Sequence, residues 1–175
     1  EIIENEVHAA NKIINDLLDF SRIKTISRES VLLSDLIAQV LEKYPAPQNV
    51  VIKTQLSTDT VLLYVDAHQI IQVLGNLVSN AFQAMPEGGL LTISAEPTKD
   101  TVAIHVMDNG CGIPQENLGK LFEPLFTTKP RGIGLGLAVS RKYVEANGGK
   151  IEVFSQPDQG SNFIVTLPLL RNENE

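Results

Sequence analysis

The sequence is poor in cysteine and has no long apolar run. Its one cysteine, Cys111, excludes an internal disulfide and is typical of a protein kept in a reducing compartment. No apolar stretch reaches the roughly 18 residues that span a bilayer, and we expect no signal peptide in this sequence. Acidic residues outnumber basic ones, 21 against 14, which argues against a general binder of nucleic acid or of anionic membranes. We therefore expect a cytoplasmic domain without nucleic-acid or membrane contacts, in which local groups hold any anionic ligand.

The chain does contain enough apolar material for one folded domain. Of its 175 residues, 43% are hydrophobic and 20% are charged, as in soluble globular proteins. Because the first residue is Glu rather than Met, we expect an excised piece of a longer protein, whose other parts could include a membrane segment.

The spacing of apolar residues predicts a mixture of helices and strands. An amphipathic pattern predicts a helix over 2–24, which must bury its stripe against a partner helix or its own domain, and 27–30 reads as a polar break. Ser34 and Asp66 are candidate caps for two later helices. The remaining pattern predicts helices at 35–43, 67–85 and 115–122, and a further helix after the glycines within 132–148. It predicts strands at 50–56, 60–65, 90–96, 101–107, 150–155 and 161–167. This order predicts an α+β sandwich with a helical layer on one face of a largely antiparallel sheet.

Three glycines at alternate positions, Gly132, Gly134 and Gly136, run into an amphipathic helix. Glycine lets the backbone approach a ligand closely, and a helix start directs unpaired N–H groups at the preceding loop. Together they predict an anion site suited to phosphates. The spacing is neither that of a P-loop nor that of a dinucleotide fingerprint. A turn whose glycines only relieve crowding is the alternative.

Polar side chains on the helix at 67–85 form a second candidate group. Asn76, Asn80 and Gln83 share one face, beside an apolar stripe. Asparagine is unfavourable inside helices, and an amide oxygen can ligate Mg²⁺. Local hydrogen bonding is the simpler explanation of the same stripe.

A third group follows the strand at 101–107. The carboxylate of Asp108 could accept a hydrogen bond from an exocyclic amine, while the glycines of 108–113 would admit a flat ring; an ordinary tight turn uses the same residue types. Further along, Lys129 and Arg131 could supply the positive charge that the chain lacks, or could be a solvated basic pair.

These stretches occur in one order that resembles a known family. They look like the N, G1, F and G2 boxes of sensor histidine kinases, in the wider gyrase, chaperone, histidine kinase and MutL ATPase superfamily, and are Asn76–Ala81, Asp108–Ile113, Phe122–Phe126 and Gly132–Leu137. Residues 80–85 and 126–129 are similar to the nitrogen-regulation type of kinase. Residues 19–22 look like the end of the second helix of a dimerisation hairpin.

The resemblance implies three parts of the chain. Residues 1–25 would be a partial dimerisation-hairpin helix, 26–170 a catalytic ATP-binding domain with the two-layer Bergerat-type fold, and 171–175 a polar tail. It also implies a homodimer formed through the hairpin and a response regulator as partner.

Position by position, the resemblance implies how ATP and Mg²⁺ would be held. Asp108 would bind the adenine amine, Asn80 would ligate Mg²⁺, and Asn76 would support the phosphates or the metal. Lys129 would contact the terminal phosphates. The implied ATP-binding set is Asn76, Asn80, Gln83, Asp108, Gly110, Gly112, Ile113, Phe126, Thr127, Thr128, Lys129, Arg131, Gly132, Ile133, Gly134, Leu135, Gly136, Leu137 and Ser161.

Two positions depart from the family pattern. Gln83 stands where many members carry Lys, and Ile133 stands where Ser or Thr is common. Phosphate charge here would therefore rest on Lys129 and Arg131. The departures bear on the efficiency of the site more than on nucleotide binding.

None of the three histidines matches the acceptor pattern of the family. His8 is not followed by the acidic residue and proline of that block. We expect His68 to be exposed at the start of its helix and His105 to be structural. The acceptor should lie upstream, on a hairpin helix outside this chain.

The resemblance implies an ATP-dependent protein-histidine kinase that relays the γ-phosphoryl group from a histidine to a response-regulator aspartate. Two alternatives stay open. A non-catalytic ATP-binding module is suggested by Gln83 and Ile133. An ATP-hydrolysing clamp is less favoured, because the base of such enzymes would stand at Asn76, and an amide cannot act as a base near neutral pH.

Overall fold

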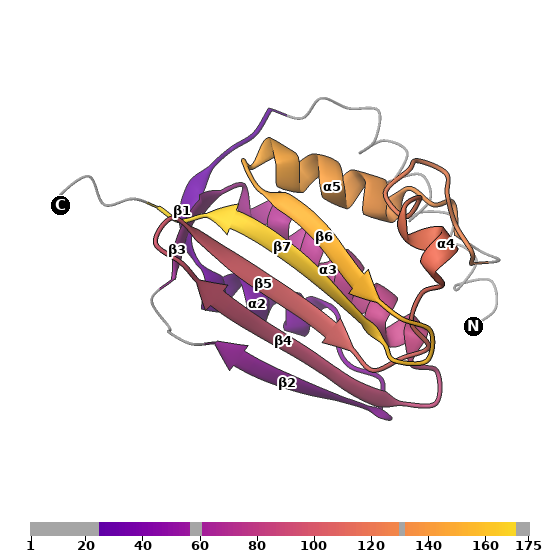
Figure 1. Ribbon diagram of the computed structural model, residues 1–175. Helices are drawn as coiled ribbons and strands as arrows, with labels where there is room; N and C mark the ends of the chain where they lie inside the picture. Colours follow the sequence, from indigo (N-terminus) through magenta and orange to yellow (C-terminus); the bar gives the residue numbers. More distant parts are fainter. Residues whose placement is uncertain (1–24, 57–60, 130–131, 171–175) are drawn as a thin grey trace, which may run out of the picture.

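The computed structural model describes residues 25–56, 61–129 and 132–170, drawn in colour in Figure 1. The predicted helix at 2–24 with His8, the turn at 57–59, Arg131 and the tail at 171–175 lie outside the described residues. What the sequence indicates for them stays a prediction.

A five-stranded sheet in the order β2–β4–β5–β7–β6 forms one layer of the domain (Figure 1). β2 pairs with β4 in parallel, and the other neighbouring pairs in this sheet are antiparallel. The strands are β2 (Val50–Leu56), β4 (Gly89–Pro97), β5 (Thr101–Asp108), β6 (Lys150–Ser155) and β7 (Ser161–Pro168). The predicted mixed, largely antiparallel sheet is confirmed.

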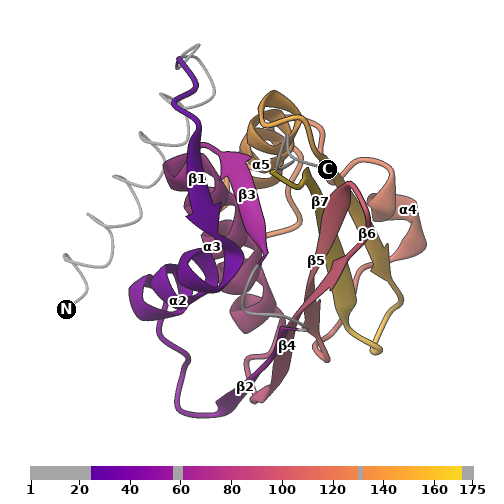
Figure 2. The same cartoon turned by 90° about the vertical axis from the view of Figure 1, so that its left-hand side faces the viewer.

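Helices α2 (Leu33–Lys43), α3 (Ala67–Ala84) and α5 (Gly136–Ala146) cover one face of the sheet (Figure 2). α3 contacts both α2 and α5. The core between the layers is apolar, and its most buried side chains include Leu36, Ile70, Leu77, Leu91, Ile104 and Leu167. Burial of each such side chain contributes about 1.5–3 kcal/mol. The predicted two-layer α+β sandwich is therefore confirmed, with α2, α3 and α5 all on one face of the sheet (Figure 2).

The structure corrects the sequence prediction at the start of the domain. The predicted polar break at 27–30 contains the beginning of β1 (Glu29–Leu32), which pairs with β3 (Leu62–Val65) in a separate two-stranded sheet. Ser34 does not cap α2, which begins at Leu33 with no side-chain cap. Instead, the Leu33 N–H donates to the Val61 carbonyl at 2.9 Å, so tertiary pairing replaces the cap.

A second correction concerns the short helix after the Asp108 loop. α4 (Gln115–Leu118) is shorter than the predicted 115–122, because the chain continues from Gly119 as hydrogen-bonded turns. Within the described part of the chain, no helix is both long and apolar enough to cross a membrane.

Asp66 and Asn147 join the start of α3 to the end of α5. As predicted, Asp66 caps α3 and accepts the Gln69 N–H at 3.1 Å. Asn147 is 1% exposed and accepts the Asp66 N–H at 2.8 Å with its side-chain oxygen. Its amide nitrogen donates to Gln69 Oε1 and to the Tyr143 carbonyl, each at 2.9 Å. These buried bonds fix the two helices relative to each other.

Replacing Asn147 with alanine leaves the Asp66 N–H and Gln69 Oε1 buried without this partner. We expect a loss of about 2–4 kcal/mol in the free energy of unfolding, measured by urea denaturation. The control is Asn49→Ala, which removes one exposed bond to the Pro86 carbonyl and should cost at most about 1 kcal/mol. Equal losses for the two variants would contradict the structural role of Asn147.

Candidate functional site

Asn76 connects α3 to the first turn of α5. Its amide nitrogen donates to Ser140 Oγ at 3.0 Å, and the Ser140 hydroxyl donates to the Gly136 carbonyl at 2.9 Å. A Cβ at Gly136 would lie 2.8 Å from the Asn76 side-chain oxygen, so only glycine fits here without displacing that amide. The glycine-rich start of α5 is thereby held directly beside the polar face of α3.

Asn80 and Gln83, on the same side of α3, both bind Lys129. The lysine Nζ lies 2.6 Å from Asn80 Oδ1 and 2.5 Å from Gln83 Oε1. Asn80 is half-buried, whereas Gln83 and Lys129 are exposed. Two amide oxygens therefore converge on one cation position, which the chain itself fills.

Asp108 ends β5 as a buried carboxylate, 5% exposed. Its Oδ1 accepts the Gly110 N–H at 2.9 Å. Burial raises the pKa of Asp108 above its ordinary value, while hydrogen bonds from the Gly110 and Ser161 backbone work in the opposite direction. A buried carboxylate of this kind suits a ligand group that donates hydrogen bonds.

The loop after Asp108 is packed backbone to backbone against the β6–β7 turn. Gly112 has φ +67°, and a Cβ there would collide with the Gln156 carbonyl. Gly160 has φ +80°, and a Cβ there would collide with the Asp108 carbonyl. Both positions need glycine, because a side chain has neither the conformation nor the space.

Hydrogen bonds hold this loop to the rest of the domain. The Cys111 N–H donates to the Ala84 carbonyl at the end of α3, at 3.0 Å. The Ile113 N–H donates to Ser155 Oγ at 2.9 Å, and the Ser155 hydroxyl lies 2.7 Å from the Gly160 carbonyl and 3.0 Å from Ser161 Oγ. Residues 108–113 with Ser155, Gly160 and Ser161 form the Asp108 group, and Asn76, Asn80, Gln83 and Lys129 form the Asn80 group. The two groups are thus linked through the C-terminal end of α3.

The connecting segment 123–135, described except for 130 and 131, follows α4 and precedes α5 in sequence, and its described residues fold back on one another. The Leu125 N–H donates to the Gly134 carbonyl at 3.0 Å. Thr127 Oγ1 accepts the Lys129 N–H at 3.0 Å. The other predicted residues here lie exposed (Thr128, Gly132), half-buried (Phe126, Ile133, Leu137) or buried (Leu135).

The structure therefore brings the predicted residues together as two linked groups, and it adds two that the sequence analysis missed. Ser140 and Ser155 carry no motif. Ser140 could have been noticed as a polar residue among buried apolar neighbours on α5, one turn after Gly136. Ser155 gives no such signal, because it lies in an alternating strand.

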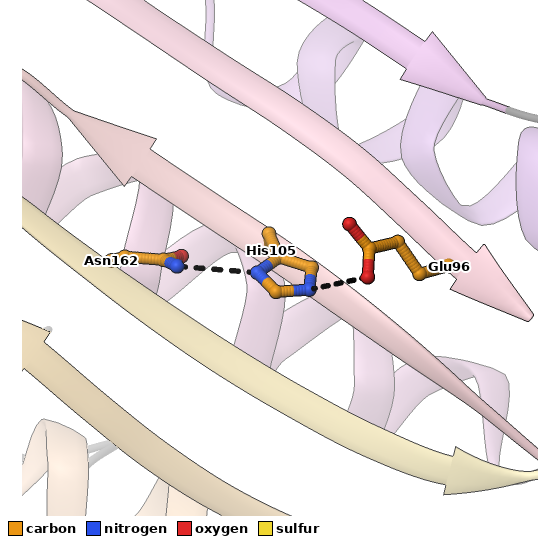
Figure 3. A network of polar contacts seen from close by, with 3 residues as sticks. All are labelled: Glu96, His105 and Asn162. Carbon is orange, nitrogen blue, oxygen red and sulfur yellow. Dashed lines mark hydrogen bonds and ion pairs between the residues drawn. The ribbon is translucent and has the colours of Figure 1, made fainter.

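His105 stands apart from both groups, as the sequence predicts. Val102, Ile104 and Val106 of β5 face the core, so His105 faces the side of the sheet opposite α2, α3 and α5. Its Nδ1 lies 3.2 Å from the Asn162 side-chain nitrogen and its Nε2 lies 3.9 Å from a Glu96 carboxylate oxygen (Figure 3). This histidine joins three strands and contacts no residue of the candidate site.

An open hollow of about 700 Å³ lies at the end of the sheet where Asp108 ends β5. It reaches Asp108 and Ser161, but its lining includes none of Asn76, Asn80 and Lys129. Its other lining residues come from β4, β6, the β6–β7 turn and α4, together with Met107, Asn109 and Asn162. The hollow therefore borders the Asp108 group and does not reach the Asn80 group.

Comparison with known proteins identifies the family. Residues 65–171 match the family model described as histidine kinase-, DNA gyrase B- and HSP90-like ATPase. The catalytic domain of the histidine kinase ThkA superposes with a TM-score of 0.71 at 33% identity, covering 81% of this chain and 95% of that one. The chain belongs to this family. Within it, the chain corresponds to the catalytic ATPase domain of sensor histidine kinases.

Longer relatives of this ATPase domain extend well beyond it. Sporulation kinase C of Bacillus subtilis (strain 168) is 32% identical over 173 residues, which are 97% of this chain and 40% of that kinase. ThkA in complex with the response regulator TrrA is 30% identical with a TM-score of 0.79, covering 99% of this chain and 51% of that one. The chain thus spans less than half the length of the curated relative.

The close approach at Gly112 predicts a stability defect on substitution. In Gly112→Ala the new side chain meets the Gln156 carbonyl in a left-handed conformation, and we expect a loss of about 1–3 kcal/mol in urea denaturation. The matched control in this ATPase domain is Gly119→Ala. Gly119 has φ −66° and no atom within 4 Å of a new Cβ, so the variant should be stabilised or unchanged within about 1 kcal/mol. A neutral Gly112→Ala would contradict the packing described.

The buried carboxylate of Asp108 predicts a pH-dependent gain from Asp108→Asn. The pKa of Asp108 is raised from 3.8 in the folded state, so its contribution to stability falls as the pH rises from that value through the folded-state pKa. The uncharged variant keeps an oxygen for the Gly110 N–H. We expect it to unfold at higher urea concentration than the wild type at pH 7, and to lose this advantage near pH 3. A less stable variant at pH 7 would contradict the burial cost.

Proposed function

We propose that this ATPase domain binds ATP with Mg²⁺ and transfers the γ-phosphoryl group to a histidine on a dimerisation hairpin. The observation that carries the proposal is the convergence of the Lys129 ammonium with Asn80 and Gln83 beside the start of α5. A flexible cation, two amide oxygens and the unpaired N–H groups of a helix start are together suited to a chain of phosphates.

Asp108 would select adenine. Its Oδ1 is used by Gly110, and the carboxylate accepts hydrogen bonds without donating any while ionised. The adenine amino group is a donor and fits this acceptor. Guanine presents a carbonyl oxygen at the same position, which a carboxylate repels. Gly110, Gly112, Ile113 and Ser161 would form the surrounding wall.

Asn80 would ligate Mg²⁺ and Asn76 would support the phosphates. Asn80 Oδ1 already faces a cation, so this hard oxygen donor fits Mg²⁺. Among the described residues no group of three His, Cys, Asp or Glu side chains could hold a metal, so phosphate oxygens and water would supply the other ligands. When bound, Mg²⁺ neutralises phosphate charge. Lys129 and residues 132–137 would hold the phosphate chain through the ammonium and backbone N–H groups.

The arrangement favours transfer over hydrolysis. Phosphoryl transfer needs positioning and charge stabilisation, whereas hydrolysis also needs a group that takes a proton from water. Asn76 is an amide, and it uses its nitrogen to bind Ser140. It cannot act as a base near neutral pH.

The acceptor and partners would lie outside the described residues. His68 is exposed in the first turn of α3, and His105 faces the side of the sheet opposite α2, α3 and α5. The ThkA complex supports a response regulator as the partner that receives the phosphoryl group. We also propose a homodimer formed through the hairpin, a cytoplasmic location and the nitrogen-regulation-like subtype.

Calorimetric titration with ATP and GTP, each with and without Mg²⁺, tests the proposed site. We expect ATP to bind and GTP not to bind. In Asp108→Asn, the amide nitrogen would face the adenine amino group. Because both groups are hydrogen-bond donors, ATP affinity should fall about tenfold or more. The control is Asp35→Asn on the exposed side of α2, which should bind like the wild type. Equal binding of ATP by both variants would contradict the role of Asp108.

Transfer is tested separately in the longer protein that contains this chain. γ-labelled ATP should yield an acid-labile phosphohistidine on the hairpin. ATP binding without label transfer would instead favour a non-catalytic module, to which the uncharged Gln83 points. Release of free phosphate without any labelled histidine would favour a hydrolysing clamp.

A further inference from the structure

We propose that Lys129 occupies the cation position of the site when no nucleotide is bound, that a divalent ion must displace it, and that Gln83 is its positioning residue. This inference rests on the proposed function and adds a regulatory exchange to it.

The two amide oxygens define one position for a positive charge. Lys129 Nζ lies within 2.6 Å of both Asn80 Oδ1 and Gln83 Oε1, which are one helical turn apart on α3. The Gln83 amide nitrogen faces Ser79 Oγ at 3.4 Å, which directs the Gln83 oxygen toward the lysine. Because neither amide carries a charge, another cation can replace the ammonium in these two hydrogen bonds.

The backbone around Lys129 presents its side chain to α3. Its N–H donates to Thr127 Oγ1 at 3.0 Å, and its carbonyl accepts the Gly132 N–H at 3.2 Å. The contacts to Asn80 and Gln83 span 49 and 46 positions in sequence. The lysine therefore fastens residues 123–129 of the connecting segment onto α3, the helix that carries Asn80.

A divalent ion and an ammonium cannot share this position. Two cations about 3 Å apart repel strongly even in a high dielectric, and the ion would take the oxygen that the lysine now uses. Ion entry would therefore release Lys129 and make it available to the phosphates. Gln83 strengthens the lysine's hold, and so raises the ion concentration that release requires.

The Mg²⁺ dependence of ADP binding by the 175-residue chain measures this exchange. ADP is used because it lacks the terminal phosphate assigned to Lys129. Lys129→Met removes the competing cation, and we expect the Mg²⁺ concentration at half-maximal ADP binding to fall about threefold to tenfold. The control is Lys120→Met, an exposed lysine outside the site, which should leave the midpoint unchanged. An unchanged or higher midpoint in Lys129→Met would overturn the exchange.

Gln83→Leu tests the positioning role. It should lower the midpoint less than Lys129→Met does, and it should add nothing in the double variant, because Gln83 acts through the lysine. If Gln83→Leu raised the Mg²⁺ midpoint both in the wild type and in Lys129→Met, Gln83 would ligate the ion itself. That result would overturn its role as a positioning residue.

A measurement without nucleotide separates this inference from the proposed function. In NMR spectra of the ¹⁵N-labelled chain without Mg²⁺, the side-chain amide signals of Asn80 and Gln83 should shift in Lys129→Met and stay in place in Lys120→Met. Unshifted side-chain amide signals in Lys129→Met would overturn the inference, whether or not the chain binds nucleotide. Failure of the wild-type chain to bind ADP or ATP at any Mg²⁺ concentration, with the amide shifts present, would overturn the proposed function alone.

Discussion

The packing of α3 against the sheet is the constraint on which the site depends. The apolar face of α3 is buried in the core through residues such as Ile70 and Leu77. This packing fixes the direction in which the polar face of the helix lies. Asn76 binds the start of α5, Asn80 binds the connecting segment, and the Ala84 carbonyl binds the Asp108 loop. A shift of α3 would therefore move every group of the site at once. The buried Asp66–Asn147 contact fixes the helix at its other end.

The Asp108 group shows that the site is built at the expense of stability. Burial raises the pKa of the carboxyl, so the folded domain bears a cost for keeping it ionised. The surrounding backbone is packed so closely that Gly112 and Gly160 can only be glycine. Such a closely packed, backbone-lined wall would lose little entropy if it bound the adenine ring proposed for this site.

The parts of the fold that could be predicted from sequence are those governed by local rules. The period of apolar residues set α3 and the strands β4 to β7 to within a residue or two, and Asp66 was recognisable as a cap because its bond is local. β1 was missed because it is short and mostly exposed, and its pairing with β3 is a long-range event. Ser34 failed as a cap for the same reason: the Val61 carbonyl, distant in sequence, receives the Leu33 N–H.

The proximity of the predicted residues could be anticipated from the sequence, but their mutual contacts could not. Motif order indicated which residues belong together, yet no spacing rule could have shown that Lys129 would lie on Asn80 and Gln83, because that contact depends on how the connecting segment folds back. The contact of Lys129 with Asn80 and Gln83 also bears on the proposed binding of phosphates. With 21 acidic residues against 14 basic ones, the chain's overall field opposes a polyphosphate. Local cations must overcome that field, and the lysine is already committed to the amides of α3. In the proposed site, phosphate binding by Lys129 would therefore require loss of its contacts to α3, because the same ammonium cannot serve both partners at once.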